Sequence, residues 1–357
     1  ERPVEVDGVD HHPRQAERPA ELADEPGGVE GRAARQVGAL DQDDAVPPEP
    51  GEPVCDRAAA DPAPDDDRSR TFLHAPRLSF VRVVASAEAV EQSVGLFNAF
   101  DYGHAVLYQR LYTAPGASVS KLEVDEFRFL TTDLLRRPPK FAIAEAAVMP
   151  TYAALVWRAV QMFDWAHVLH RQIYDVSADE RIPLEEKSRL VERITDYYLS
   201  NQALAFSAEP KSMALMDDAY YSKVFRRGYP KFNGLVWSYH WLQVGLYEPL
   251  IGGETASARA GGVAETLAQF WRMVDSASVG FPLEMPLTAA VAPRFSARHP
   301  RAAIIFDNLH MLHDIISDIL VSDRVPRAAK RRVIGEALAE FRDGSKNTMS
   351  LNDWGNM

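Results

Sequence analysis

Cysteine is almost absent from this chain: it occurs once in 357 residues, as Cys55. Residues 71–357 therefore contain no thiol at all. This absence excludes disulfides, Cys-x-x-Cys redox chemistry, thiolate zinc sites, cysteine-bound iron–sulfur clusters and a catalytic cysteine from that part of the chain. A metal ion bound there would have to use imidazole and carboxylate ligands.

Long apolar runs are also missing, and so are several well-known motifs. No apolar run reaches the roughly 18 residues that a transmembrane helix needs, and the given N-terminus shows no secretory signal. The chain has no P-loop, G-x-G-x-x-G, G-x-S-x-G or H-E-x-x-H motif, which leaves nucleotide-dependent and serine hydrolase chemistry without support. We expect a cytoplasmic protein without a transmembrane segment, although export stays open because the true N-terminus is uncertain.

The sequence also has no basic stripe of the kind that binds nucleic acid. We therefore expect no nucleic-acid partner, and instead a small-molecule substrate or oxygen. A redox partner and a homo-oligomer both stay open.

Large side chains are missing from residues 1–70, which contain no Phe, Tyr, Trp, Ile, Met or Lys. This segment has 19 acidic residues against 8 arginines, a net charge of −11 out of −12 for the whole chain. A segment with so little to bury cannot offset the entropy lost on ordering. We predict a disordered acidic tail rich in Pro, Ala and Gly. It is either an over-extended gene start or cloned extension, with the real protein beginning near Thr71, or an acidic interaction tail.

Residues 71–357 have helical periodicity almost throughout, with no alternating strand pattern and no hairpin signal. The pattern predicts a single all-α domain, a multi-helix bundle of about eight helices, four of them long core helices. Proline marks several boundaries, because it is favoured at helix starts and disfavoured inside helices. The predicted helices cover residues 87–113, 122–136, 151–175, 184–200, 232–250, 263–277, 300–322 and 327–342.

One five-residue pattern, F-D-x-x-H, occurs three times in the long predicted helices, at residues 100–104, 163–167 and 306–310. Histidine is scarce, with 10 copies in the chain, so this recurrence indicates a common purpose. Asp at position i and His at i+3 lie on one face of a helix. A carboxylate and an imidazole so placed suit a metal site between helices.

Further histidines extend this pattern. The second and third copies are each followed by another histidine one turn later. The remaining long helix, predicted over 232–250, carries His240 without the F-D pair. The predicted metal ligands are Asp101, His104, Asp164, His167, His170, His240, Asp307, His310, His313 and Asp314. A competing interpretation is that these residues form ordinary Asp–His pairs on the solvent faces of amphipathic helices.

The arrangement resembles in part the ferritin-like di-metal carboxylate proteins, in which a Glu-x-x-His motif repeats on paired helices of a four-helix core. Here Asp stands where that motif has Glu, the helices supply more histidines, and the two further bridging glutamates are not found. Glu145 and Glu248 are the only glutamates near the predicted helices that could bridge. The resemblance covers short motifs and architecture, so we do not assign the chain to that family.

Imidazole and carboxylate without thiolate suit a divalent or redox metal ion, and we favour iron, with copper, manganese or zinc as alternatives. Haem between two histidines is less favoured, since no C-x-x-C-H attachment motif is present. Tyrosine and tryptophan residues near the motifs favour redox chemistry. The leading hypothesis is a non-haem, possible di-metal oxidoreductase. The alternatives are a non-enzymatic haem- or metal-carrying or interaction scaffold, and a metallohydrolase.

Overall fold

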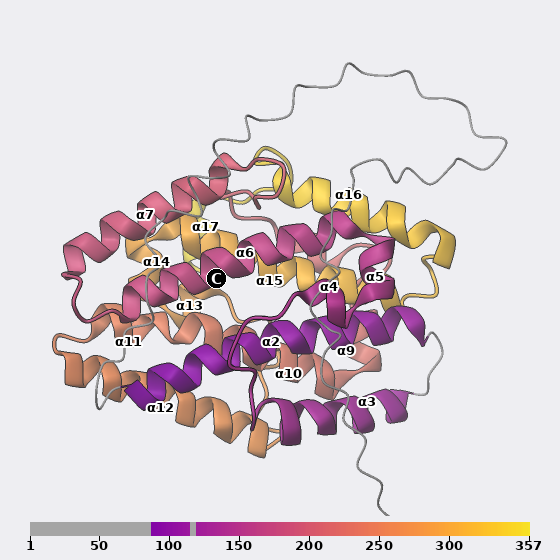
Figure 1. Cartoon of the computed structure of the whole chain (residues 1–357). Helices are drawn as coiled ribbons and strands as arrows, with labels where there is room; N and C mark the ends of the chain where they lie inside the picture. The colour runs from indigo at the N-terminus through magenta and orange to yellow at the C-terminus, as the bar shows by residue number, and fades with distance from the viewer. Residues whose placement is uncertain (1–86, 115–118) are drawn as a thin grey trace, which may run out of the picture. The chain divides into compact units, whose positions relative to one another are not determined.

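The computed structural model of the chain describes residues 87–114 and 119–357. The tail predicted for residues 1–70 lies outside the described residues. Within the described part the structure is helical (Figure 1), and the one β-type pairing there is an isolated bridge between Lys211 and Thr348. The prediction of an all-α bundle is therefore confirmed.

Eight of the described α-helices have seven residues or more, as the periodicity predicts. They are α2 (Ala87–Thr113), α3 (Val119–Arg128), α6 (Trp157–Ala178), α7 (Leu184–Ser200), α10 (Pro230–Gly245), α12 (Ala256–Asp275), α15 (Pro300–Val321) and α16 (Lys330–Arg342).

Short helical segments connect these long helices. Two of the predicted helices are interrupted: Val156 separates two segments where one helix was expected over 151–175, and Leu246 does the same within 232–250. Helix α12 starts at Ala256, earlier than predicted. The short segments are a π-helix η1 (Phe129–Leu134), a 3₁₀ turn η2 (Arg327–Ala329), α4 (Glu145–Val148), α5 (Pro150–Leu155), α8 (Ala214–Asp217), α9 (Val224–Gly228), α11 (Tyr247–Gly252), α13 (Thr288–Val291), α14 (Pro293–Arg298) and α17 (Leu351–Gly355).

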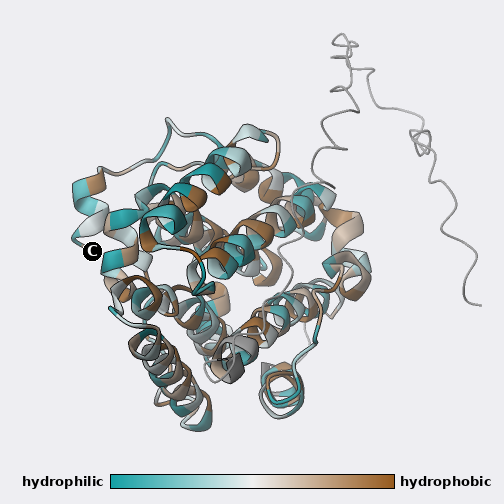
Figure 2. Cartoon of the chain, turned by 60° about the vertical axis from the view of Figure 1, so that its left-hand side comes forward, coloured by the Kyte–Doolittle hydropathy of each residue, from teal (hydrophilic) through white to brown (hydrophobic). Residues whose placement is uncertain are grey.

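Helix α15 forms the centre of the core. Every residue from Ala302 to Leu320 is buried, and the helix packs against α2, α6, α14 and α16 among others (Figure 1). A helix that is apolar on most sides has to be surrounded by other elements. The outer helices are amphipathic instead, with hydrophilic and hydrophobic residues on the same helix (Figure 2).

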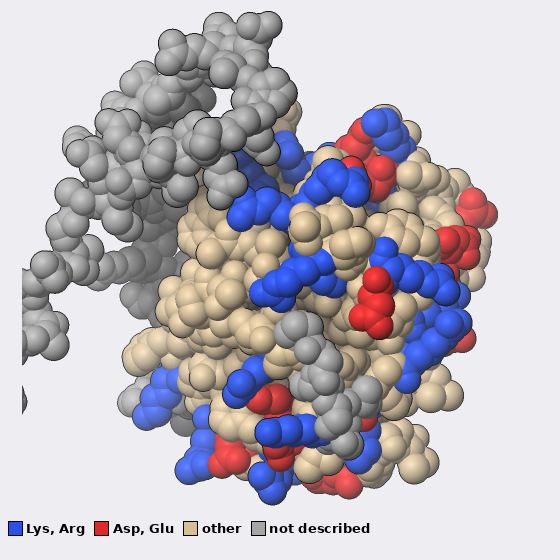
Figure 3. Space-filling view, turned by 90° about the vertical axis from the view of Figure 1, so that its right-hand side faces the viewer, with Lys and Arg blue, Asp and Glu red and all other residues tan. Residues whose placement is uncertain are grey.

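Most charged side chains of the described residues lie at least partly exposed, although several, such as Glu145 and Lys330, are buried. Figure 3 shows one face on which Lys and Arg side chains are scattered over several elements and accompanied by acidic ones. Surface pairs such as Arg110–Glu126, at 2.7 Å, and Arg332–Glu336, at 2.6 Å, contribute little stability because water screens them. Burial of apolar residues around α15 is therefore what holds the four long core helices together.

Candidate metal centre

Six histidines from four helices meet in the interior. Each is at most 3% exposed, and neighbouring rings have centroids 4.0 to 6.4 Å apart. The interpretation as solvent-facing pairs is therefore wrong for these histidines. They are His104 on α2, His167 and His170 on α6, His240 on α10, and His310 and His313 on α15.

Three of these imidazoles point ring nitrogens at one another. Nε2 of His240 lies 3.2 Å from Nε2 of His104 and 3.3 Å from Nδ1 of His313. Two nitrogens bound to one tetrahedral ion at about 2.0–2.1 Å lie about 3.3 Å apart. These three residues, here called the histidine trio, therefore have ligand spacing before any ion is bound, and they could hold a metal ion.

The hydrogen bonding of His104 fixes its tautomer. Its Nδ1 lies 2.8 Å from the carbonyl oxygen of Phe100, one helical turn earlier. A carbonyl can only accept, so Nδ1 carries the proton and the lone pair is on Nε2, which faces the other two imidazoles. Metal-binding histidines commonly have their second nitrogen held in this way.

The trio is uncharged at neutral pH. Burial, reinforced by the neighbouring His167, lowers the pKa of His104 to about 3. Burial and the surrounding imidazoles also hold the pKa values of His240 and His313 well below the ordinary value. Neutral imidazoles can bind a cation without first losing a proton.

A second group lies beside the trio and consists of Asp101, Glu145 and His167, here called the acidic group; it too could hold a metal ion. Nδ1 of His167 is 2.6 Å from Oε1 of Glu145 and 3.5 Å from Oδ1 of Asp101. Burial lowers the pKa of His167, but the charge and hydrogen bond of Glu145 outweigh burial and raise it above the ordinary value. Arg171 forms an ion pair with the other oxygen of Asp101.

Asp164, from the second motif, is half-buried at the edge of the acidic group. Burial, together with the charge of Glu145, raises the pKa of Asp164 to about 7, although His167 opposes this. Asp164 is thus the most exposed of the three carboxylic acids near His167, the other two being Asp101 and Glu145.

The two remaining predicted carboxylates have protein partners. Asp307 accepts hydrogen bonds from the backbone and hydroxyl of Thr288, at 2.8 and 2.7 Å, and from Nε1 of Trp354 at 2.7 Å. Asp314 accepts one from Nε1 of Trp237 at 2.8 Å. Burial raises the pKa of Asp307 to about 6 and that of Asp314 to about 7. The structure brings neither into the trio or the acidic group.

Glu145 is the site residue that the sequence pattern did not include among the ligands. It lies at the start of the four-residue helix α4, in a stretch with no strong periodicity. Its proximity to the predicted helices was the one available signal. Burial of its side chain and its contact with His167 arise from the packing of α4 against α2 and α6.

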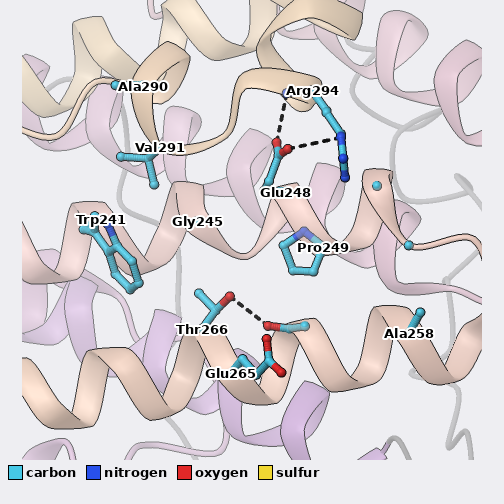
Figure 4. A pocket seen from close by; sticks show the side chains of 13 residues that line it. Trp241, Gly245, Glu248, Pro249, Ala258, Glu265, Thr266, Ala290, Val291 and Arg294 are labelled. Atoms are coloured by element: carbon cyan, nitrogen blue, oxygen red, sulfur yellow. Dashed lines mark hydrogen bonds and ion pairs between the residues drawn. The ribbon is translucent and has the colours of Figure 1, made fainter.

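A surface pocket of about 570 Å³ lies apart from these groups, between α10, α12 and the short helices α11, α13 and α14 (Figure 4). Figure 4 shows Glu248 paired with Arg294 on one side, and Trp241 and Thr266 also line the pocket. None of the six histidines lines it.

Comparisons with protein-family models, curated protein sequences and solved structures gave no match for this chain. Among the described residues, the helices are too short or too polar to cross a membrane.

Proposed function

We propose that this protein is a non-haem metal oxidoreductase whose metal ion is bound by His104, His240 and His313. The single observation that carries the proposal is the spacing of the trio's ring nitrogens, 3.2 and 3.3 Å. Three neutral, fully buried imidazoles at this spacing lose hydrogen bonds to water on folding and regain them poorly from one another. A cation bound between them would satisfy all three lone pairs.

Iron is the favoured ion, because imidazole ligands beside buried carboxylates suit it; copper, manganese and zinc are the alternatives. Haem is disfavoured by the same spacing. A macrocycle would have to enter between His104 and His240, whose Nε2 atoms are 3.2 Å apart. Three protein ligands leave coordination positions open for a reactant.

The reactant is small. Each residue of the trio is at most 3% exposed. Aromatic side chains cover their rings: the ring centroids of Phe163 and His313 are 4.4 Å apart, and those of Tyr239 and His104 are 6.1 Å apart. Molecular oxygen or a species of its size could reach such a centre more readily than a large hydrolysable substrate. This enclosure favours oxidoreductase over hydrolase chemistry.

The acidic group supplies proton transfer in this proposal. The ring of His167 lies 5.7 Å from that of His313, and its hydrogen bond to Glu145 keeps it charged more readily than the other histidines. A positioned imidazolium–carboxylate pair can deliver or accept a proton at a neighbouring reacting atom. Oxygen chemistry requires protons as well as electrons, so the two groups complement each other.

A zinc-dependent hydrolase is the second candidate, because three imidazoles with an open position are also a zinc arrangement that activates water. The distinction depends on which metal is present and whether it changes oxidation state.

The test is elemental analysis of the whole purified chain with an absorption spectrum of the same sample. We expect bound iron, lost in both His104→Leu and His313→Leu but retained in His299→Gln, which alters a buried histidine outside the cluster. A spectral change on adding oxygen to the reduced protein supports oxidoreductase chemistry. Zinc alone, with no oxygen response, favours the hydrolase. A folded chain that takes up no metal leaves only the scaffold interpretation.

A further inference from the structure

The buried trio has to receive electrons through the protein. Each of its imidazoles is at most 3% exposed, so an organic reductant cannot touch a metal ion bound there. Oxygen reduction consumes electrons as well as protons, and the acidic group supplies only protons. The electrons therefore need a site of entry at the surface and a route from that site to the trio.

A series of aromatic rings leads from the trio toward the surface. The ring of His240 stacks on that of His310, with centroids 4.0 Å apart. The centroid of His310 is 6.1 Å from that of His170, whose ring stacks on Tyr247 at 5.4 Å. Tyr247 in turn stacks on Phe295 at 4.3 Å. These five rings, here called the ring series, come from α10, α15, α6, α11 and α14.

A hydrogen bond fixes the contact between His170 and Tyr247. The hydroxyl of Tyr247 lies 2.7 Å from Nδ1 of His170 and donates to the carbonyl oxygen of His170 at 2.9 Å. With its proton on the carbonyl, the tyrosine oxygen accepts from the Nδ1–H of the imidazole. Both residues are buried, so the two rings are held together away from water.

The ring series ends beside the surface pocket of Figure 4. Glu248 and Arg294 line this pocket and pair with each other, and each is adjacent in the sequence to one of the last two rings. Trp241 also lines the pocket and directly follows His240 of the trio. A helix with its side chains is about 10–12 Å across. Since α10 carries both residues, the pocket lies about one helix diameter from the trio.

The walls of the pocket suit a flat ring that carries oxygen atoms. Its volume of about 570 Å³ is that of a small-molecule site. Trp241 offers an aromatic surface, and Gly245 and Gly262 leave the wall flat beside it. Glu265 on α12 and Arg294 lie on opposite sides of the pocket (Figure 4). One hydroxyl of a hydroquinone can donate to the carboxylate, and the other can accept from the guanidinium.

We propose that this pocket binds a small planar hydroquinone, and that the ring series carries its electrons to the metal ion of the trio. The proposal depends on the proposed function, because that ion receives the electrons. Oxidation of one hydroquinone to the quinone releases two electrons and two protons, and the protons go to Glu265 and then to water. Reduction of one oxygen molecule to hydrogen peroxide consumes two electrons and two protons, so the two half-reactions balance.

Binding is tested on the metal-free whole chain by anaerobic calorimetric titration with 1,4-naphthohydroquinone. We expect one equivalent to bind, and Trp241→Leu to weaken the affinity about 10-fold because an aromatic contact is lost. The matched control is Trp271→Leu, which alters a half-buried tryptophan that does not line the pocket and should bind as the wild type does. No binding, or an equal loss in both variants, would overturn the assignment of the pocket.

The electron route is tested by mixing the oxidised, metal-loaded chain with 1,4-naphthohydroquinone without oxygen and following the absorption of the metal. We expect Tyr247→Leu to lose most of the rate of reduction, with its metal content and its affinity for the hydroquinone unchanged. Tyr247→Phe keeps the ring but not the hydrogen bond to His170, so it should lose less of the rate. It decides the test if Tyr247→Leu does not fold.

The control for the route is Tyr198→Phe, which alters a buried tyrosine outside the ring series and should leave the rate unchanged. A wild-type rate in the folded Tyr247 variants would overturn the route. A chain that binds metal and responds to oxygen but does not bind the hydroquinone would overturn this inference alone. A chain that binds the hydroquinone but no metal would overturn the proposed function and the route together.

Discussion

At the scale of single residues, burial decides what each titratable group can do. The imidazoles of the trio are neutral because desolvation lowers their pKa values, whereas His167 is kept protonatable by Glu145. Two aspartates with the same motif position have different surroundings. Asp101 lies beside His167, while Asp307 accepts from Thr288 and Trp354. The motif therefore specifies residue type, and the neighbours specify the role.

Asp318 gives a residue-scale prediction for pH. Burial raises its pKa to about 6, even though the backbone N–H groups of Lys223 and Phe225 donate to it at 2.7 Å and oppose the shift. A carboxyl with a raised folded-state pKa stabilises the fold fully below about pH 4, and this contribution is lost as the pH rises through about 6. The wild type should therefore lose about 3 kcal/mol relative to Asp318→Asn between pH 4 and 7.5.

Urea unfolding of the metal-free protein at several pH values measures this difference. Asp323→Asn is the control, because Asp323 is exposed nearby. A wild-type advantage over Asp318→Asn that stays constant with pH would show that the carboxyl titrates normally.

At the scale of elements, helix ends and close contacts govern stability. The C-terminal end of α15 is capped from α16: the ammonium group of Lys330 donates to the carbonyl oxygens of Ile319 and Leu320, at 2.7 and 2.9 Å. Lys187 donates in the same way to Ser177 at the end of α6. These carbonyls have no partner within their own helix, so a buried cation is a favourable cap.

Lys330→Met should lower the free energy of unfolding by about 1–3 kcal/mol, since it leaves buried carbonyls unpaired. The matched control is Arg332→Met, which removes an exposed pair with Glu336 and should cost under about 1 kcal/mol. Both changes in the free energy of unfolding are measured from the urea midpoints, provided that the dependence of this free energy on urea concentration is the same in each variant. Equal effects would mean that the cap contributes no more than a surface ion pair.

Substitutions at two helical glycines distinguish the effect of close packing on stability from the effect of helix propensity. A methyl group at Gly234 of α10 would meet the ring of Phe281 at 2.7 Å, whereas one at Gly335 of α16 would meet nothing within 4 Å. Alanine is favoured over glycine inside a helix by about 1 kcal/mol. We expect Gly335→Ala to raise the melting temperature and Gly234→Ala to lower it, because Phe281 would have to move.

Calorimetry of the two glycine variants gives the comparison. If Gly234→Ala were as stabilising as Gly335→Ala, the approach of Phe281 to α10 would not be a tight contact in solution.

At the scale of the whole molecule, four long helices that are far apart in the sequence bring their histidines together in one buried cluster. The cluster places polar nitrogens where a core normally has apolar atoms. Buried nitrogens that have no partner lower the free energy of unfolding. Metal binding and folding should therefore be coupled.

Removal of metal with a chelator should lower the melting temperature of the wild type. Free metal at 1,000 times its dissociation constant stabilises a fold by about 4 kcal/mol, so the loss should be large enough to measure by calorimetry. The variant His313→Leu, which lacks a trio ligand, should not respond to the chelator. An equal response in both proteins would locate the stabilising ion outside the trio.

The sequence by itself determined where most helices lie and which ligand types a metal site could use. Periodic apolar residues and flanking prolines act locally, so helices such as α2, α7 and α15 begin and end close to where the pattern predicts. The recurrence of F-D-x-x-H, together with the lack of thiols, restricted any metal site to imidazole and carboxylate ligands. The breaks at Val156 and Leu246 carried no local signal of their own.

Only the tertiary structure decided which residues meet. The rotation and depth of each helix depend on packing between segments that are distant in the sequence. The apolar periodicity within a single helix does not encode them. This is why Glu145 joins the acidic group from a short helix, and why Asp307 and Asp314 face other partners. Burial, which follows from the same packing, made the six histidines neutral or partnered and so set what they can bind.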